Sequence, residues 1–273
     1  MTFEAAIDYS LRVLLIIVMG VLAYRAEAVD KKGLLSGYLV GSAILLVGGW
    51  GMFALIAYFF VIASLATKYR YEYKRSKGVA EEKRGARSAG NVLGNGIVAT
   101  VFALGEFLFK GEIWALGYIG AVAMVTSDTL ATEIGLLYWN PPRLITDLRK
   151  KVEPGQSGGV TPLGYLTIIL SSLSVGALAW MFNVVPGATL CKILSVALTS
   201  GLIGSTVDSI LGATVQAQYR CRVCGKLTEK SIHCGEKTVY VKGCKVINNH
   251  VVNLTGSLIG ALTAILVGIY IIT

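Results

Sequence analysis

Charged residues are scarce in this chain of 273 residues: they make up 15% of it, against roughly 25% in an ordinary soluble domain. A simple water-soluble globule is therefore excluded. The chain has two histidines, and neither lies near the centre of an apolar segment, which disfavours catalysis by a histidine base. It also lacks the G-x-x-x-x-G-K-[ST] motif of P-loop nucleotide sites and the glycine fingerprint of a dinucleotide fold.

Apolar residues are abundant, at 54% of the chain with a mean hydropathy of +0.65. They form long runs, and a membrane-spanning helix needs about 20 such residues. The sequence predicts an all-α polytopic membrane bundle of about eight transmembrane helices, forming a single domain over residues 1–273, with the first run retained as a span. The predicted spans are 8–24, 33–49, 50–66, 91–108, 113–137, 161–182, 189–214 and 250–272.

Basic residues lie between the predicted spans rather than in one stripe. Of 25 lysines and arginines, 22 lie in four connections, which are every second one along the chain. These connections are 25–33, 67–90, 138–160 and 215–249. The positive-inside rule predicts that they face the cytoplasm of a cell membrane and that both termini lie outside. Topology and attraction to anionic lipid thus explain the net charge of +9, and no nucleic-acid partner is needed.

Polar and glycine-rich blocks interrupt the apolar runs where they approach this predicted cytoplasmic face. The blocks are 90–96, 127–135, 157–165, 204–214 and 248–253. Helix packing alone would explain many of the glycines and amides. Two intramembrane carboxylates, Asp128 and Asp208, are costly unless they hold a cation or a proton. We therefore expect a polar pocket at the cytoplasmic boundary of the bundle.

The residues of these blocks suit metal-assisted phosphate chemistry. Carboxylates, amides and hydroxyls are the oxygen ligands that Mg²⁺ prefers, and Mg²⁺ leaves coordination positions free for phosphates. Basic side chains such as Arg84 and Arg87 precede the first block. Phosphoryl transfer needs mainly positioning and charge neutralisation, so this combination would suffice without a nucleophilic side chain.

The order of the motifs carries a resemblance that covers nearly the whole chain. Gly-Asn-x-x-Gly-Asn-Gly is followed by Ser-Asp-Thr-x-Ala-Thr-Glu-Ile-Gly, Gly-Gly-Val-Thr-x-x-Gly, Asp-Ser-x-Leu-Gly-Ala-Thr-x-Gln, Cys-x-x-Cys and Asn-x-x-x-Asn. This order resembles the integral-membrane family of phytyl-phosphate kinase and transmembrane protein 19, also called domain of unknown function 92. The resemblance implies a kinase that uses a nucleoside triphosphate, CTP by preference, to convert phytyl, geranylgeranyl or another prenyl monophosphate into the diphosphate.

Roles follow for the residues of the blocks. We assign Asp128, Asp208 and Glu133 to catalysis, with Asp128 and Asp208 holding Mg²⁺. The residues assigned to substrate and nucleotide binding are Asn91, Asn95, Arg87, Ser127, Thr129, Gly158, Gly159, Thr161 and Asn253.

Four of the five cysteines lie in the connection 215–249 as Cys221, Cys224, Cys234 and Cys244, with His233 beside them. Structural disulfides are disfavoured in a reducing cytoplasm. The two-residue spacing of the first pair is that of a zinc knuckle, and the remaining cysteines or His233 could complete a tetrahedral Zn²⁺ site. Reduced bystander thiols and a redox pair are the alternatives.

Two other functions fit part of the pattern. A cytidylyltransferase acting on a lipid phosphate needs the same metal and pocket, but it would release pyrophosphate where a kinase releases CDP. A cation or lipid transporter would also use intramembrane carboxylates and glycine-broken helices. It would place polar residues near the midplane and on both sides, whereas here only Glu106 and Glu112 lie toward the other face. A purely structural scaffold leaves the carboxylates unexplained.

Overall fold

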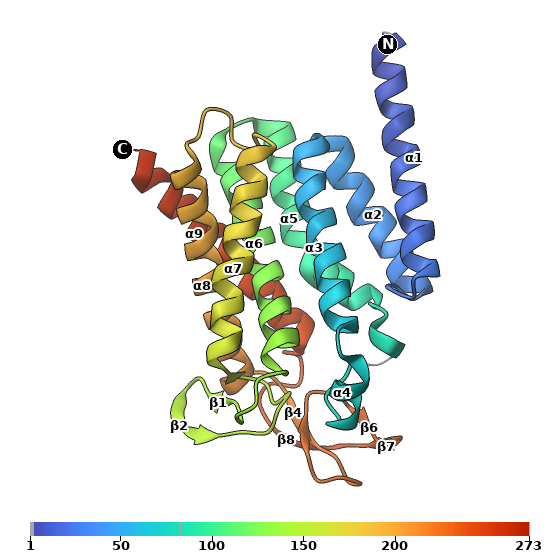
Figure 1. The fold of residues 1–273 in the computed structure, drawn as a ribbon, viewed down its shortest axis with the longest axis vertical. Helices are drawn as coiled ribbons and strands as arrows, with labels where there is room; N and C mark the ends of the chain where they lie inside the picture. The colour runs from blue at the N-terminus through green and yellow to red at the C-terminus, as the bar shows by residue number, and fades with distance from the viewer. Residues whose placement is uncertain (1–2, 82, 273) are drawn as a thin grey trace.

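The computed structural model describes residues 3–81 and 83–272, and long helices dominate them (Figure 1). The long helices are α1 (Phe3–Arg25), α2 (Lys31–Val47), α3 (Gly49–Lys68), α5 (Ala89–Phe109), α6 (Glu112–Gly135), α7 (Pro162–Met181), α8 (Leu190–Thr214) and α9 (Asn249–Ile272). The short ones are α4 (Tyr71–Ser76) and the 3-10 turn η1 (Lys83–Gly85). The strands are β1 (Arg143–Leu144), β2 (Asp147–Lys151), β3 (Gly159–Val160), β4 (Gln218–Arg220), β5 (Leu227–Thr228), β6 (Ile232–His233), β7 (Glu236–Lys237) and β8 (Val239–Lys242).

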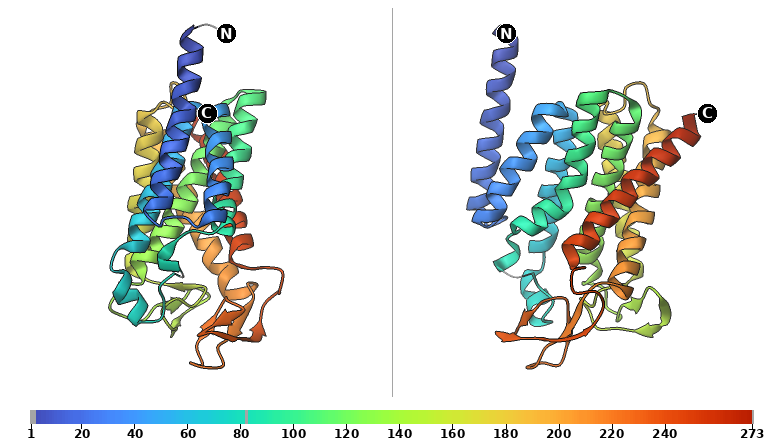
Figure 2. Two further views of the ribbon diagram at one scale, coloured as in Figure 1. Left: turned by 90° about the vertical axis from the view of Figure 1, so that its right-hand side faces the viewer. Right: turned by 180° about the vertical axis from the view of Figure 1, so that it is seen from behind.

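Seven helices of the described residues are long and apolar enough to cross a membrane, namely α1, α3, α5, α6, α7, α8 and α9. The eighth long helix, α2, has 17 residues, at the short end of the range of about 17–25 for a span. It packs against α1, α3 and α5, alongside the spanning helices (Figure 2). The predicted all-α, multi-pass membrane bundle is thus confirmed.

Local chemistry sets the two ends of α2. Asp30 caps its first turn, because the carboxylate Oδ1 accepts a hydrogen bond from the Gly33 N–H at 2.8 Å. At the other end the chain reverses at Gly48 and Gly49 and enters α3 directly. Gly49 has a φ of +71°, a conformation that favours glycine. Helix α2 therefore has the length of the predicted span 33–49, displaced by two residues toward the N-terminus.

Helix α6 forms the centre of the bundle. It packs against α3, α5, α7, α8 and α9, and most of its side chains are buried. Its contact with α9 is close because small residues meet there: a Cβ atom added to Gly120 would lie 2.4 Å from the carbonyl oxygen of Gly260. In contrast, α1 lies at the edge of the bundle, where its apolar side chains remain exposed. The polar residues of α6 are therefore carried by the most deeply buried of the candidate membrane spans.

The four basic connections lie at one end of the bundle, and the first turns of α1 and last turns of α9 lie at the other (Figure 1). Two of these connections carry small antiparallel sheets, in the strand orders β2-β1-β3 and β5-β4-β8, and β6 pairs with β7. These strands were not predicted. With eight long helices, both termini lie at the same end of the bundle, as the predicted topology requires. The assignment of the loop-bearing end to the cytoplasm stays a prediction.

Candidate active site

Asp128 and Asp208 lie on neighbouring helices, each about two turns before the end of α6 or α8 that carries the loops. Both are half-buried, and they are close enough for their charges to repel. Across residues 3–81 and 83–272, no lysine or arginine forms an ion pair with either one. Two adjacent carboxylates without a basic partner are an arrangement that a bound cation would stabilise.

Asn253 of α9 connects this pair to α5. Its carboxamide lies 3.1 Å from Asn95 Oδ1 on one side, and with its nitrogen turned toward Asp208 it donates to Oδ2 at 3.2 Å on the other. Gly256, one turn later, lies against both α6 and α8, because a Cβ atom there would lie 2.4 Å from Met124 Cε and 3.4 Å from Asp208 Oδ2. The structure therefore brings together three residues that the sequence assigned to the site.

Ser127 joins α6 to α8 beside the carboxylates. Its hydroxyl lies 3.0 Å from the Ser205 hydroxyl, and it donates to the Met124 carbonyl at 3.0 Å. Because Ser127 is buried and its hydroxyl contacts Ser205, the two helices are held close together at this point. Thr129, the next residue after Asp128, is half-buried.

Glu133 has a buried partner that the sequence analysis missed. Its Oε2 lies 2.6 Å from Nζ of Lys74, which α4 places beneath the bundle. Lys74 is one of many basic residues in the connection 67–90, and nothing in the spacing distinguished it. The predicted catalytic role of Glu133 stays a prediction, and one of its carboxylate oxygens is already paired with Lys74.

Arg87 lies just before α5 and is buried, with 8% of its surface exposed. Its guanidinium stacks over the Phe59 ring at 5.6 Å, and its Nε has no hydrogen-bond partner among the described residues. Burial lowers the pKa of Arg87, while the carboxylates of Glu133 and Glu81 act in the opposite direction. The side chain is thus a buried cation with unused hydrogen-bonding capacity.

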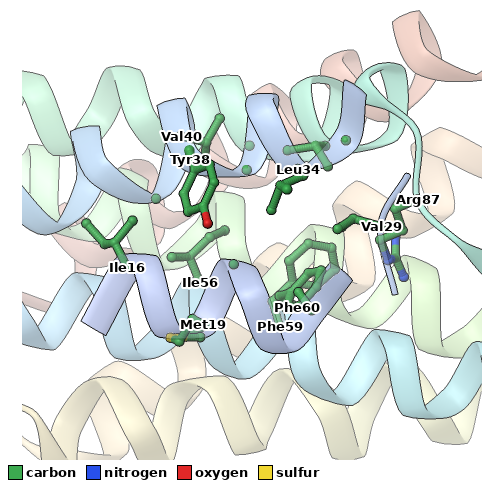
Figure 3. Close-up of a pocket in the computed structure, with 18 of the residues that line it drawn as sticks. Ile16, Met19, Val29, Leu34, Tyr38, Val40, Ile56, Phe59, Phe60 and Arg87 are labelled. Carbon is green, nitrogen blue, oxygen red and sulfur yellow. The ribbon is translucent and has the colours of Figure 1, made fainter. Parts of the chain in front are cut away.

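An apolar cavity of about 130 Å³ ends at Arg87. It lies between α1, α2, α3 and α5, and Asn91 lines it beside the arginine. Figure 3 shows Arg87 and Val29 at one end, with Ile16 and Tyr38 toward the other. A long apolar space with a cation and an amide at one end matches a ligand that has an apolar tail and an anionic head.

The residues assigned to the third block already have local partners. Thr161 caps α7, because its hydroxyl accepts from the Gly164 N–H at 3.0 Å. The Gly159 N–H donates to the Gln156 carbonyl at 3.0 Å. Gly158 has a φ of +80° and packs on α8, where a Cβ atom would lie 2.5 Å from that of Ala213. Their predicted role in binding substrate and nucleotide stays a prediction, and these contacts explain the residues structurally.

Glu229, in the loop 221–235 beneath the bundle, is a further acid near the carboxylate pair. It accepts a hydrogen bond from Gln216 Nε2 at 2.8 Å and is close enough to Asp208 for their charges to repel. Burial raises the pKa of Glu229 and the nearby Glu81 adds to this effect, while the Gln216 amide opposes it. The sequence carried no signal for this residue, because it lies outside the apolar runs.

The cysteine loop gathers a set of metal-ligand atoms. Those of Cys221, Cys224, His233 and Cys234 all lie within 4.8 Å of one another. Cys244 is not among them, and its N–H donates to the Val215 carbonyl. The N–H of Cys224 points at the Cys221 sulfur and is the main cause that lowers the pKa of Cys221 to about 6. Of the residues that the sequence offered to complete the site, the structure brings Cys234 and His233 to the first pair and leaves Cys244 apart, and the binding of Zn²⁺ stays a prediction.

Similar sequences occur in archaea, plants and cyanobacteria. The uncharacterized membrane protein MJ0933 of Methanocaldococcus jannaschii is 28% identical over 268 residues, which cover 97% of each chain. Protein PGR of Arabidopsis thaliana is 30% identical over 270 residues, covering 91% of this chain and 92% of that protein. The chloroplastic protein VTE6 of the same plant is 26% identical over 251 residues, covering 89% of this chain and 66% of that protein. No solved structure matches.

The family described as integral membrane protein DUF92 matches residues 14–261, which is most of the chain and includes every residue assigned to the site. Its membrane character agrees with the seven long apolar helices. The protein therefore belongs to the DUF92 family of integral multi-pass membrane proteins.

Proposed function

We propose that this protein is a membrane kinase that transfers a phosphoryl group from a nucleoside triphosphate, CTP by preference, to an isoprenoid monophosphate such as phytyl or geranylgeranyl phosphate. The observation that carries the proposal is the apolar cavity that ends at the buried Arg87 and the half-buried Asn91. These residues lie at the start of α5, and Asp128 and Asp208 lie toward the ends of α6 and α8, which reach the same loop-bearing end of the bundle. The motif resemblance to the family of phytyl-phosphate kinase supports the same reaction.

The cavity would hold the acceptor. A prenyl tail that enters the cavity from the bilayer moves from one apolar environment to another, so little water is released. Van der Waals packing in the cavity would therefore favour binding of the tail. The phosphate head would supply the specific attraction, through a charge-assisted hydrogen bond from Arg87 and a hydrogen bond from Asn91. Because α1 covers the cavity on one side and packs weakly on the rest of the bundle, the tail has a route of entry.

Asp128 and Asp208 would hold Mg²⁺, with the Asn253 amide orienting Asp208. The fit rests on their donor chemistry, since the pair offers carboxylate oxygens and has no basic partner among residues 3–81 and 83–272. Mg²⁺ bound there would neutralise the negative charge of the nucleotide phosphates. Since the site and the basic connections share one end of the bundle, we propose that this end meets cytosolic nucleotide at the inner face of a cell membrane.

The transfer requires no nucleophilic side chain. An oxygen of the prenyl monophosphate attacks the γ-phosphorus of the nucleoside triphosphate. The bond from this phosphorus to the β–γ bridging oxygen breaks, and its electron pair leaves with the nucleoside diphosphate. The second pKa of a phosphate monoester is about 6, so the attacking group is already ionised at neutral pH and needs no histidine base. The products are the prenyl diphosphate and the nucleoside diphosphate.

The test is to incubate purified protein in lipid nanodiscs with Mg²⁺, a panel of prenyl monophosphates and each γ-labelled nucleoside triphosphate. The proposal expects label in the prenyl diphosphate and an equal amount of nucleoside diphosphate. Release of pyrophosphate with a nucleotide-linked lipid would identify a cytidylyltransferase and overturn the proposal. The absence of turnover together with movement of labelled lipid or cation across proteoliposomes would identify a transporter.

Three variants test whether these residues carry out the proposed transfer. Asp128→Asn and Asp208→Asn should abolish diphosphate formation, and Arg87→Gln should raise KM for the prenyl phosphate while leaving KM for the nucleotide nearly unchanged. Glu72→Gln is the matched control, because within residues 3–81 and 83–272 the one ion pair of this exposed glutamate is with the exposed Arg75. Full activity of both aspartate variants would contradict the metal assignment.

A further inference from the structure

The loop between β4 and β8 contains a group of soft ligands that the proposed transfer does not use. We propose that Cys221, Cys224, His233 and Cys234 form a structural Zn²⁺ site, which orders this loop beneath the carboxylate pair. The four ligand atoms already lie within 4.8 Å of one another. Three thiolates and one imidazole are a typical ligand set of closed structural zinc sites.

The spacing of the ligand atoms fits a tetrahedron around zinc. With Zn–S bonds of about 2.3 Å and Zn–N bonds of about 2.0–2.1 Å, the sulfur–nitrogen edges of a tetrahedron are about 3.6 Å long. His233 Nδ1 lies 3.6 Å from Cys224 Sγ and 3.2 Å from Cys234 Sγ. A zinc ion thus needs only small side-chain shifts to bind all four ligands.

The backbone of the first pair has the form of a zinc knuckle. The N–H groups of Val223 and Cys224 both point at Cys221 Sγ, at 3.4 and 3.5 Å. Such N–H groups stabilise a metal-bound thiolate and fix its orientation. Gly225 follows with a φ of +74°, and Cys234 with a φ of +53° precedes Gly235 at +80°. Two tight turns therefore direct the cysteines of both segments toward one point.

The loop needs a link of this kind because it has no hydrophobic core. Strands β5, β6 and β7 have two residues each, and the side chains of β7 and β8 are exposed. Short segments that bury so little apolar surface do not hold a single conformation unless a metal or a disulfide joins them. The three cysteines of the loop are free thiols, so metal binding is the link that these residues can supply.

The site lies where an ordered loop matters. Glu229 is between Cys224 and His233 in the chain and contacts Gln216 at the end of α8. Lys226 of the same loop donates to the Lys77 carbonyl, next to α4, at 3.0 Å. Zinc would thus hold these two contacts in place at the loop-bearing end of the bundle.

The test is to measure bound metal in protein purified from zinc-supplemented cells without added chelator. The proposal expects one Zn²⁺ per chain by mass spectrometry, loss of most of it in Cys224→Ser and Cys234→Ser, and full retention in Cys244→Ser and Cys191→Ser. After exchange with Co²⁺, the protein should show the thiolate charge-transfer band and the intense visible bands of a tetrahedral site. Zinc that is absent and not taken up on titration would overturn the proposal, and so would zinc that both loop variants retain.

A second pair of variants keeps the test valid if the serine variants fold poorly. His233→Cys preserves a four-ligand site and should retain zinc, whereas His233→Ala should bind it at least tenfold more weakly. Elution as a single species in detergent reports folding of the bundle independently of the loop. Equal zinc affinity in both histidine variants would contradict the assignment of His233. None of these readouts depends on kinase activity, so the zinc site and the proposed function can fail separately.

Discussion

Lys74 Nζ lies 2.6 Å from Glu133 Oε2, and this ion pair joins the short helix α4 to the loop-bearing end of α6. The two side chains expose only 1% and 8% of their surface. Lys74 also donates to the Ala66 and Thr67 carbonyls at 2.7 and 3.3 Å. All three protons of the ammonium group therefore have acceptors, as a buried charge requires.

Lys74→Met should destabilise the protein, because it leaves the Glu133 carboxylate buried without a partner. Loss of one partner of a buried pair typically costs about 3–5 kcal/mol. Unfolding in mixed micelles by titration with sodium dodecyl sulfate would measure the change. Arg75→Met is the matched control on the same helix, since its exposed pair with Glu72 is worth about 1 kcal/mol or less. The double variant Lys74→Met with Glu133→Leu should recover much of the loss, and a double variant worse than the single would contradict a simple ion pair.

Gly37→Leu should narrow the cavity without disturbing the fold. Gly37 lines the cavity, and a Cβ atom added there meets no atom within 4 Å. If the cavity holds the prenyl tail, KM for a twenty-carbon acceptor should rise about tenfold or more, and KM for a five-carbon acceptor should change little. Leu39→Phe is the control on the same helix, because Leu39 is 65% exposed on the outer surface of the bundle.

Equal KM changes for both chain lengths in Gly37→Leu would place the tail elsewhere. The comparison of two acceptors in one variant separates a filled cavity from general damage, which would raise both values together.

Glu229→Gln should stabilise the docked loop at neutral pH. The folded protein raises the pKa of Glu229, mainly by burial, so it binds the proton more tightly than the unfolded chain does. Stability from this group therefore increases as pH falls through the raised pKa, and it decreases as pH rises. The glutamine resembles the protonated acid and still accepts from Gln216, so it should remove this pH dependence.

Limited proteolysis at the lysines of the loop, followed from pH 5 to pH 8, would measure the effect. Wild-type cleavage should accelerate with rising pH, and Glu229→Gln should be cleaved at one slow rate throughout. A wild-type rate that falls with rising pH, after correction for the protease's own profile, would refute the argument.

Asn253→Ala should weaken the use of Mg²⁺ under the proposed function. The variant removes the amide that contacts Asp208 and Asn95, and loss of such an orienting group typically lowers metal affinity by about 10–100-fold. The Mg²⁺ concentration for half-maximal turnover should rise accordingly, with partial recovery at saturating Mg²⁺. Asn140→Ala, in an exposed loop, should leave the Mg²⁺ dependence unchanged. An unchanged Mg²⁺ requirement in Asn253→Ala would separate this amide from the metal.

Much of the fold was predictable because a membrane imposes simple rules. Backbone groups in hydrocarbon must be paired within the helix, so each long apolar run had to be a helix. The order of the spans also placed Asn95, Asp208 and Asn253 at one predicted face of the membrane, and the structure brings them into contact. The ion pair of Lys74 and Glu133 joins residues 59 positions apart, and no periodicity links a loop lysine to one particular acid.

The sequence by itself determined that the protein is a membrane helical bundle, with basic connections and polar blocks at one end, because length and hydropathy decide which segments enter a bilayer. Only the tertiary structure decided which of those polar residues meet. It paired Glu133 with Lys74, ended an apolar cavity at Arg87, and set His233 rather than Cys244 beside three cysteines. These choices depend on side-chain packing and on turns with positive φ, which act between segments far apart in the chain.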